Sequence, residues 1–139
     1  MYHYSYRSMR RLLECHPDLQ TLFKEVIKHV DCTIICGTRS EQDQILAYET
    51  RKTKLKWPHS KHNRTPSLAV DVAPYPINWE NTNRFYWFAG IVMGIASQLR
   101  QQGMMKHPVR FGGDWDQDYN ITDQKFNDLL HFELVIPRL

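Results

Sequence analysis

The sequence predicts an α+β fold in which helices pack around a small, mostly antiparallel sheet. Apolar runs of strand length are mixed along the chain with longer segments of helical periodicity. The expected strands lie at 31–37, 67–73, 109–111 and 131–136. Their order with the helices shows no regular strand–helix–strand repeat, which would be typical of a parallel sheet with crossover helices.

The size and composition are those of an ordinary globular protein. The chain has 139 residues, of which 42% are hydrophobic and 24% are charged, and this size suits one domain over residues 1–139. The net charge of +3 permits contact with anionic surfaces, but no dense basic run indicates a nucleic-acid partner. The three cysteines form no CxxC pair, so we expect free thiols in a reducing compartment.

Nothing in the sequence predicts export or membrane insertion. Residues 1–7 contain no apolar signal-peptide core. The longest apolar stretch, 85–99, is too short to span a bilayer and contains Gly90 and Gly94. We therefore expect synthesis in the cytosol without a signal peptide, no stable membrane insertion, and release by another factor if the protein acts outside.

Three helices are expected in the first half of the chain. The first covers 4–15, and the second begins at Pro17, a residue that suits the first helical turn. The second helix carries an amphipathic pattern of apolar residues at Leu19, Leu22, Phe23, Val26, Ile27 and Val30. Ser40 is a candidate N-cap for the third helix, from Glu41 to about Tyr48.

The second half begins with a polar loop at 50–66. The strand at 67–73 follows and is stopped by Pro74 and Pro76. The helix from Asn81 to Gln102 is apolar almost all round, so we expect it to be central. The remaining expected elements are a strand at 109–111, a turn-rich loop at 112–116, a helical turn at 122–127 and a strand at 131–136.

Asp71 is the residue that points most clearly to chemistry, because it lies inside the apolar strand at 67–73. An unpaired carboxylate is costly there, and a metal ion is one of the few good compensations. A hydrolytic zinc site takes three His or carboxylate ligands and keeps one position for water. His62 and Asp71 offer two ligands, and His131 is the best source of a third. Asp128, three residues before His131, could act as a general base.

Spacing alone leaves other interpretations open. A lone histidine beside a loop is usually a surface residue, and the chain contains seven. A lone aspartate in a strand can cap a turn or pair with an arginine. His59 and His107 also compete with His62 as ligands.

Two separated motifs resemble the signatures of the D-Ala-D-Ala metallopeptidase family. The first is Ser60-x-His62 followed by Ala69-x-Asp71, and the second is Asp128-x-x-His131-x-Glu133. The family includes vancomycin-resistance dipeptidases, D,D-carboxypeptidases and the L-alanyl-D-glutamate endopeptidases of phages, and the hedgehog signalling domain shares its fold. The resemblance runs from about residue 12 to 136, and it implies a hedgehog-like zinc peptidase fold.

The resemblance also implies roles for individual residues. His62, Asp71 and His131 match the zinc ligands, Asp128 matches the general base, and Arg39 matches the arginine that steadies the carbonyl oxygen. Three more residues are candidates for contact with substrate or support of the ligands: Ser60, Glu133 and Trp115. For Glu133 a salt bridge at the strand is an equal alternative. For Trp115 packing is the more usual role of an aromatic residue at such a position.

Two features depart from the commoner family pattern. Nine positions separate His62 from Asp71, where seven is more usual, and the spacing resembles a phage subgroup with a longer loop. The candidate base is Asp128, where many members carry glutamate.

The resemblance implies a zinc-dependent peptidoglycan peptidase, a phage or prophage endolysin that cleaves the L-alanyl-D-glutamate bond of stem peptides. We expect a monomer that accumulates in the host cytoplasm and acts on the wall after membrane permeabilisation. A D-alanyl-D-alanine carboxypeptidase is the alternative within the enzyme class. A non-enzymatic, zinc-containing wall-binding domain is the alternative outside it. A nucleic-acid enzyme is disfavoured because there is no basic stripe.

Overall fold

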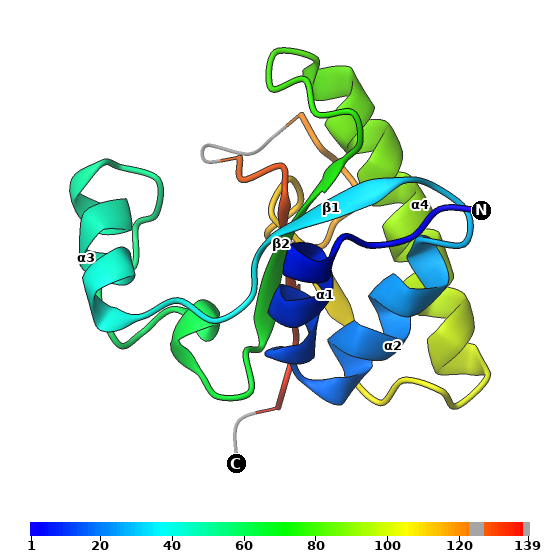
Figure 1. Cartoon of the computed structure of the whole chain (residues 1–139), viewed down its shortest axis with the longest axis horizontal. Helices are drawn as coiled ribbons and strands as arrows, with labels where there is room; N and C mark the ends of the chain where they lie inside the picture. Colours follow the sequence, from blue (N-terminus) through cyan, green and yellow to red (C-terminus); the bar gives the residue numbers. More distant parts are fainter. Residues whose placement is uncertain (123–126, 138–139) are drawn as a thin grey trace.

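The computed structural model describes residues 1–122 and 127–137 (Figure 1). Its helices are α1 (Tyr6–Leu13), α2 (Pro17–Val26), α3 (Glu41–Glu49), the short 3-10 helix η1 (Lys61–Asn63) and α4 (Thr82–Gln101). Its strands are β1 (Cys32–Cys36), β2 (Ala69–Pro74), β3 (Val109–Phe111) and β4 (His131–Leu134). The strands form one sheet in the order β1-β2-β4-β3, and each neighbouring pair is antiparallel. The predicted α+β class is therefore confirmed.

One face of the sheet packs against α2 and α4. Phe132 lies at the centre of this core, with its ring against the rings of Phe23, Phe88 and Phe111. Val70 of β2 belongs to the same buried cluster. Because side chains alternate across a strand, the neighbours of Val70 and Phe132 must point to the opposite face. That face carries Asp71, His131, Glu133 and Arg110.

The free edge of β1 is covered by α1. The hydroxyl oxygen of Ser8 accepts a hydrogen bond from the backbone amide of Ile34 at 3.1 Å. Arg11 donates to the carbonyl oxygen of Ile34 at 3.0 Å. An unpaired strand edge exposes backbone groups that can pair with another chain, so α1 protects the sheet at this position.

Several predicted helix ends match the structure. Pro17 occupies the first turn of α2, and Ser40 caps α3 by accepting a hydrogen bond from the Asp43 amide. The expected helical turn at 122–127 falls largely on residues 123–126, which lie outside the described residues. The last strand is shorter than predicted, because β4 ends at Leu134.

The prediction that the long helix is central was wrong. The buried residues of α4 form one stripe: Phe85, Phe88, Ala89, Val92, Ala96 and Leu99. The opposite side is open, since Trp87 is 56% exposed and Gly90 and Gly94 are also exposed. Glycines such as Gly90 and Gly94 made the helix look apolar on every side. Residues of this size can lie at the surface without being covered by another part of the protein. Among the residues that the structure describes, no helix combines the length and apolar character needed to cross a membrane.

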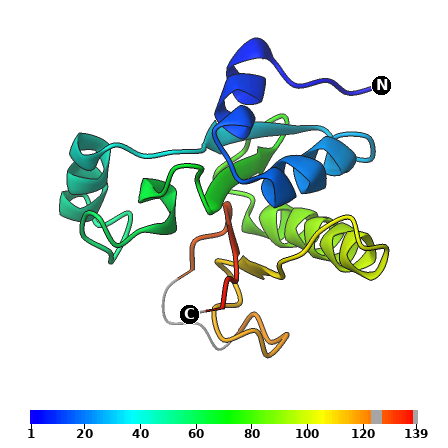
Figure 2. The same cartoon turned by 90° about the horizontal axis from the view of Figure 1, so that it is seen from below.

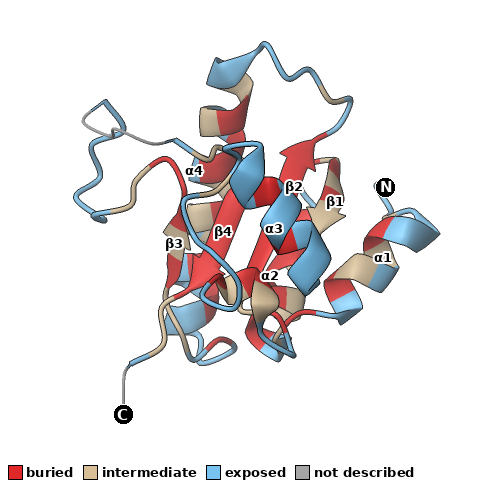
Figure 3. Ribbon diagram, turned by 90° about the vertical axis from the view of Figure 1, so that its left-hand side faces the viewer, coloured by how far each residue is buried: buried red, intermediate tan, exposed pale blue. Residues whose placement is uncertain are grey.

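Helix α3 projects from the body of the protein. Figures 1 and 2 show α3 and η1 at one end of the molecule, with α2 and α4 at the other. Figure 3 shows that α3 is largely exposed, whereas the sheet behind it is buried. The segment from β1 through α3 to η1 therefore lies along one side of the polar face of the sheet.

Candidate metal centre

Three side chains that the sequence predicts as ligands lie together on the polar face of the sheet. His62 comes from η1, Asp71 from β2 and His131 from β4, and Asp71 and His131 are directly opposite in the strand register. His62 Nε2 lies 3.2 Å from Asp71 Oδ1 and 3.3 Å from His131 Nδ1. His131 Nδ1 lies 3.3 Å from Asp71 Oδ1. All three residues are buried.

Each imidazole is oriented by a hydrogen bond on its other nitrogen. His62 Nδ1 lies 2.7 Å from the carbonyl oxygen of Gly37, which can only accept, so Nδ1 is the donor. His131 Nε2 lies 2.9 Å from Glu133 Oε1, so this nitrogen donates to the carboxylate. In the neutral rings, His62 Nε2 and His131 Nδ1 are therefore acceptors with free lone pairs.

With both rings neutral, three acceptor atoms thus converge, and this arrangement suits a metal cation between them. A tetrahedral zinc ion with bonds of about 2.0–2.2 Å separates its ligand atoms by about 3.3–3.6 Å. The observed separations of 3.2, 3.3 and 3.3 Å agree with that geometry. Burial disfavours a charged His62, yet the Asp71 carboxylate outweighs burial and raises the pKa of His62 to about 10. The same negative potential attracts a divalent cation.

Cys36, which the sequence predicts only as a free thiol, offers an alternative ligand. One ligand atom from each of Cys36, His62 and Asp71 lies within 4.8 Å of the others. The Cys36 sulfur, however, approaches His62 at Nδ1, at 3.9 Å, and this nitrogen already donates to Gly37. The set of two histidines and Asp71 therefore suits zinc better.

Glu133 makes both contacts that the sequence left as alternatives. It accepts a hydrogen bond from His131, and its Oε2 also lies 2.7 Å from Arg110 Nη2 and 2.9 Å from Lys61 Nζ. Burial opposes ionisation of Glu133, but His131, Lys61 and Arg110 together lower its pKa to about 2. A charged carboxylate behind a ligating histidine fixes the ring orientation and raises its basicity.

Asp128 lies beside the three converging atoms but further away. Its Oδ2 is 4.0 Å from His131 Nδ1. Gly112 sets this position, because a Cβ atom there would lie 2.2 Å from the carbonyl oxygen of Asp128. Burial and the negative charge of Asp71 raise the pKa of Asp128 to about 6. In the sequence Gly112 stands out only as part of a turn-rich motif, which does not reveal this close approach.

Arg39 lies on the other side of Asp71. Its Nη2 is 3.5 Å from Asp71 Oδ2. Its backbone amide donates to the carbonyl oxygen of His62 at 2.8 Å. The structure therefore brings together Arg39, Asp128 and the three predicted ligands.

Ser60 and Trp115 are both close to the site, in different ways. Ser60 is buried and caps η1, where its hydroxyl oxygen accepts a hydrogen bond from the His62 amide at 3.2 Å. It therefore supports the ligand from behind. The Trp115 ring lies with its centroid 5.3 Å from that of His131, and the Arg110 guanidinium lies 5.6 Å from the Trp115 centroid.

Two clefts open onto the site. The first has a volume of about 720 Å³, and its lining includes Leu46 of α3 and Trp79, which stacks on Phe85 of α4. The second has a volume of about 540 Å³ and is lined by Lys54 and Trp115. Arg39 and Asp128 line both clefts. An extended ligand that occupied both clefts would therefore pass directly over these two residues.

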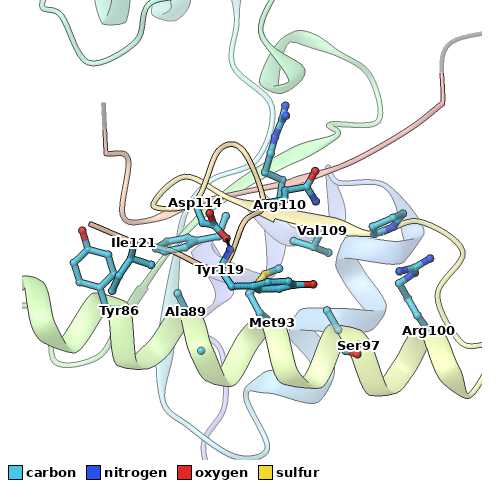
Figure 4. A pocket seen from close by; sticks show the side chains of 15 residues that line it. Tyr86, Ala89, Met93, Ser97, Arg100, Val109, Arg110, Asp114, Tyr119 and Ile121 are labelled. Carbon is cyan, nitrogen blue, oxygen red and sulfur yellow. Dashed lines mark hydrogen bonds between the residues drawn. The ribbon is translucent and has the colours of Figure 1, made fainter. Parts of the chain in front are cut away.

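A further cavity of about 470 Å³ lies between α4 and the loop that follows β3 (Figure 4). Its lining includes Ala89, Met93 and Val109 but none of the converging ligands.

The same loop, which the sequence predicts only as a turn, carries a group of carboxylates at Asp114, Asp116 and Asp118. Their oxygens lie within 4.8 Å of one another. An oxygen-only set differs from the nitrogen-rich centre and would prefer harder cations.

Comparisons with known proteins identify the family and agree with the fold. Residues 1–135 match the model of a family described as phage L-alanyl-D-glutamate peptidase. Among solved structures, the chain is similar to the crystal structure of the Serratia marcescens L-Ala D-Glu endopeptidase ChiX, with 23% sequence identity and a TM-score of 0.70. That similarity covers 96% of this chain and 91% of the other. A search of the curated proteins gave no match. The family resemblance drawn from the two motifs is confirmed.

Proposed function

We propose that this member of the phage L-alanyl-D-glutamate peptidase family, a peptidoglycan-cleaving peptidase, is a zinc enzyme. We further propose that it is specific for the L-alanyl-D-glutamate bond. The observation that carries the proposal is the convergence of three buried acceptor atoms beside Asp128. His62, Asp71 and His131 would hold the ion. Two imidazoles and one carboxylate are a donor set found in catalytic zinc sites, which keep a further position for water.

Asp128, Arg39 and Glu133 have separate roles in the reaction. When bound, zinc supplies Lewis acidity and lowers the pKa of a coordinated water to about 7. Asp128 accepts the proton of the attacking water and delivers it to the leaving amine. Arg39 donates hydrogen bonds to the carbonyl oxygen as negative charge develops there. Glu133 holds His131 in the tautomer that presents Nδ1 to the metal.

The two clefts support a substrate that extends on both sides of the scissile bond. A stem peptide bound across Arg39 and Asp128 would place one residue in the cleft beside α3 and the next beside Trp115. This favours an endopeptidase, because a carboxypeptidase needs only one extended side and a group that holds a free terminal carboxylate.

The biological setting that we propose is host lysis by a phage or prophage. The protein would act as a single domain and a monomer. It would accumulate in the host cytoplasm and reach the wall after the membrane is permeabilised.

The test is cleavage of purified Gram-negative peptidoglycan by the zinc-loaded protein, with mass spectrometry of the released ends. We expect new D-glutamate amines and L-alanine carboxylates, which a chelator abolishes and zinc restores. Release of free D-alanine would assign the protein to the carboxypeptidases instead. Zinc binding without any cleavage would favour the wall-binding domain.

A further inference from the structure

Gln44 is a fully buried polar residue on α3, a helix whose other residues, apart from Ala47, are exposed. All of its amide groups have partners. Its Oε1 accepts hydrogen bonds from Arg39 Nη1 at 3.0 Å and from Asn63 Nδ2 at 3.2 Å. Its Nε2 donates to the carbonyl oxygen of Leu55 at 2.6 Å. A buried amide is costly unless it is bonded in this way, so the residue has a definite role.

The orientation of the Gln44 amide is fixed by its partners. Arg39 and Asn63 present only donors to it, while Leu55 presents only an acceptor. Rotation of the amide by half a turn would place donor against donor and acceptor against acceptor. Gln44 therefore holds one nitrogen of the Arg39 guanidinium in a single position.

The other terminal nitrogen of the guanidinium, Nη2, is thereby directed to the metal centre. With Nη1 bonded to Gln44, Nη2 of Arg39 lies 3.5 Å from Asp71 Oδ2. The guanidinium is planar and rigid, so fixing one nitrogen fixes the direction of the other. We propose that Gln44 is a positioning residue for catalysis, which acts by orienting Arg39 toward the substrate carbonyl. This inference rests on the proposed role of Arg39 as a donor to that carbonyl.

Asn63 extends the same network to the ligand His62. Its Nδ2 donates to Gln44 and also to the carbonyl oxygen of Arg39 at 3.1 Å. The Arg39 amide in turn donates to the carbonyl oxygen of His62. The position of Arg39 relative to the metal ligand is thus set at both its backbone and its guanidinium. Asn63 directly follows His62 in η1, so the turn that carries the ligand also supports Arg39.

A double-mutant cycle on the zinc-loaded full chain tests the proposal. The variants are Gln44→Met, Arg39→Ala and the double substitution, and the assay follows release of stem-peptide fragments as kcat and KM separately. Gln42→Met is the matched control, since Gln42 lies on the same helix and is exposed. Zinc content and thermal unfolding are measured for every variant. If Gln44→Met does not fold, Gln44→Asn, which keeps the amide but shortens it, enters the same cycle.

We expect Gln44→Met to lower kcat by about 10- to 100-fold, the scale of misplacing one catalytic group, with zinc content unchanged. In the Arg39→Ala background the same substitution should change kcat by less than about twofold, because its target is absent. An equal loss of kcat in both backgrounds, or no loss in the wild type, would overturn the proposal. A wild-type protein that binds zinc but cleaves nothing would instead count against the proposed function.

Discussion

His62 Nε2 and His131 Nδ1 lie 3.3 Å apart, and the hydrogen bonds on their opposite nitrogens leave both atoms as acceptors. Two lone pairs directed at each other, with Asp71 Oδ1 beside both, are unfavourable without a positive charge between them.

The most direct consequence concerns the Asp71 carboxylate. Asp71→Asn keeps the size of the side chain and removes its charge, so we expect loss of zinc binding and of activity. Equilibrium dialysis with metal analysis measures the first effect, and peptidoglycan cleavage measures the second. Glu49→Gln, at an exposed position that lines neither cleft, should change neither.

Asp128 is expected to act on the water rather than to hold the metal. Asp128→Asn should retain one zinc per chain but lose about 10²- to 10⁴-fold in kcat, the usual contribution of a general base. Metal content and turnover are measured on the same preparation. A variant that loses its zinc would identify Asp128 as a ligand, and a variant with normal turnover would remove it from the mechanism.

Glu133 is expected to affect metal affinity without touching the metal. Glu133→Gln retains an oxygen that can accept from His131, but it removes the charge that Lys61 and Arg110 pair with. We predict zinc affinity weaker by about 10- to 100-fold, as is typical for residues that support a ligating histidine. Competition with a chromophoric chelator gives the affinity. An unchanged affinity would show that the hydrogen bond to His131 is sufficient without the negative charge of Glu133.

The core that supports the site has its own prediction. Phe132 is fully buried between the rings of Phe23, Phe88 and Phe111. Phe132→Ala should lower the free energy of unfolding by about 3–5 kcal/mol, since it leaves a cavity beside the strand that carries His131. Trp87→Ala, at a residue that is 56% exposed, should change it by less than about 0.5 kcal/mol. Denaturant titration compares the two variants, and equal effects would contradict this assignment of the core.

Buried thiols and a buried phenol should make the fold sensitive to alkali. Burial raises the pKa values of Cys15 and Cys32 to about 12, and it also raises that of Tyr4. These folded-state values exceed the unfolded ones, so the stabilisation is complete below the unfolded pKa of about 9 and is lost as the pH rises toward 12. Denaturant titrations at pH 8 to 11 should show a shallower decline for Cys32→Ala than for wild type. A wild-type slope in Cys32→Ala would contradict this account of the buried thiols.

Much of the fold and of the candidate site could be predicted because local rules decide them. Ser40 and Pro17 mark helix starts through chemistry that lies within one turn. The cost of a carboxylate in an apolar strand singles out Asp71 from the sequence alone. Spacing alone left other interpretations open, and the resemblance of the two motifs to a known family supplied His62, His131 and Asp128.

Other features depend on contacts between distant segments and could not be predicted from local patterns. The sequence does not show that Gly112 must lack a side chain for Asp128 to pass, because that contact forms only in the folded sheet. Glutamine is usually found on the exposed side of a helix. Gln44 is buried instead, because Arg39, Asn63 and Leu55 form hydrogen bonds with its amide. In helix α4 the opposite occurs: Gly90 and Gly94 suggested a helix buried on every side, but both are exposed.

X-ray absorption spectroscopy of the zinc-loaded protein at the zinc edge is the sharpest test of the proposed ligand set. We expect a shell of nitrogen and oxygen atoms only, at about 2.0–2.2 Å, with scattering from two imidazole rings. A shell with scattering from fewer than two imidazole rings would remove His62 or His131 from the ligand set. A sulfur atom at about 2.3 Å would place Cys36 on the metal and contradict the site described for His62, Asp71 and His131.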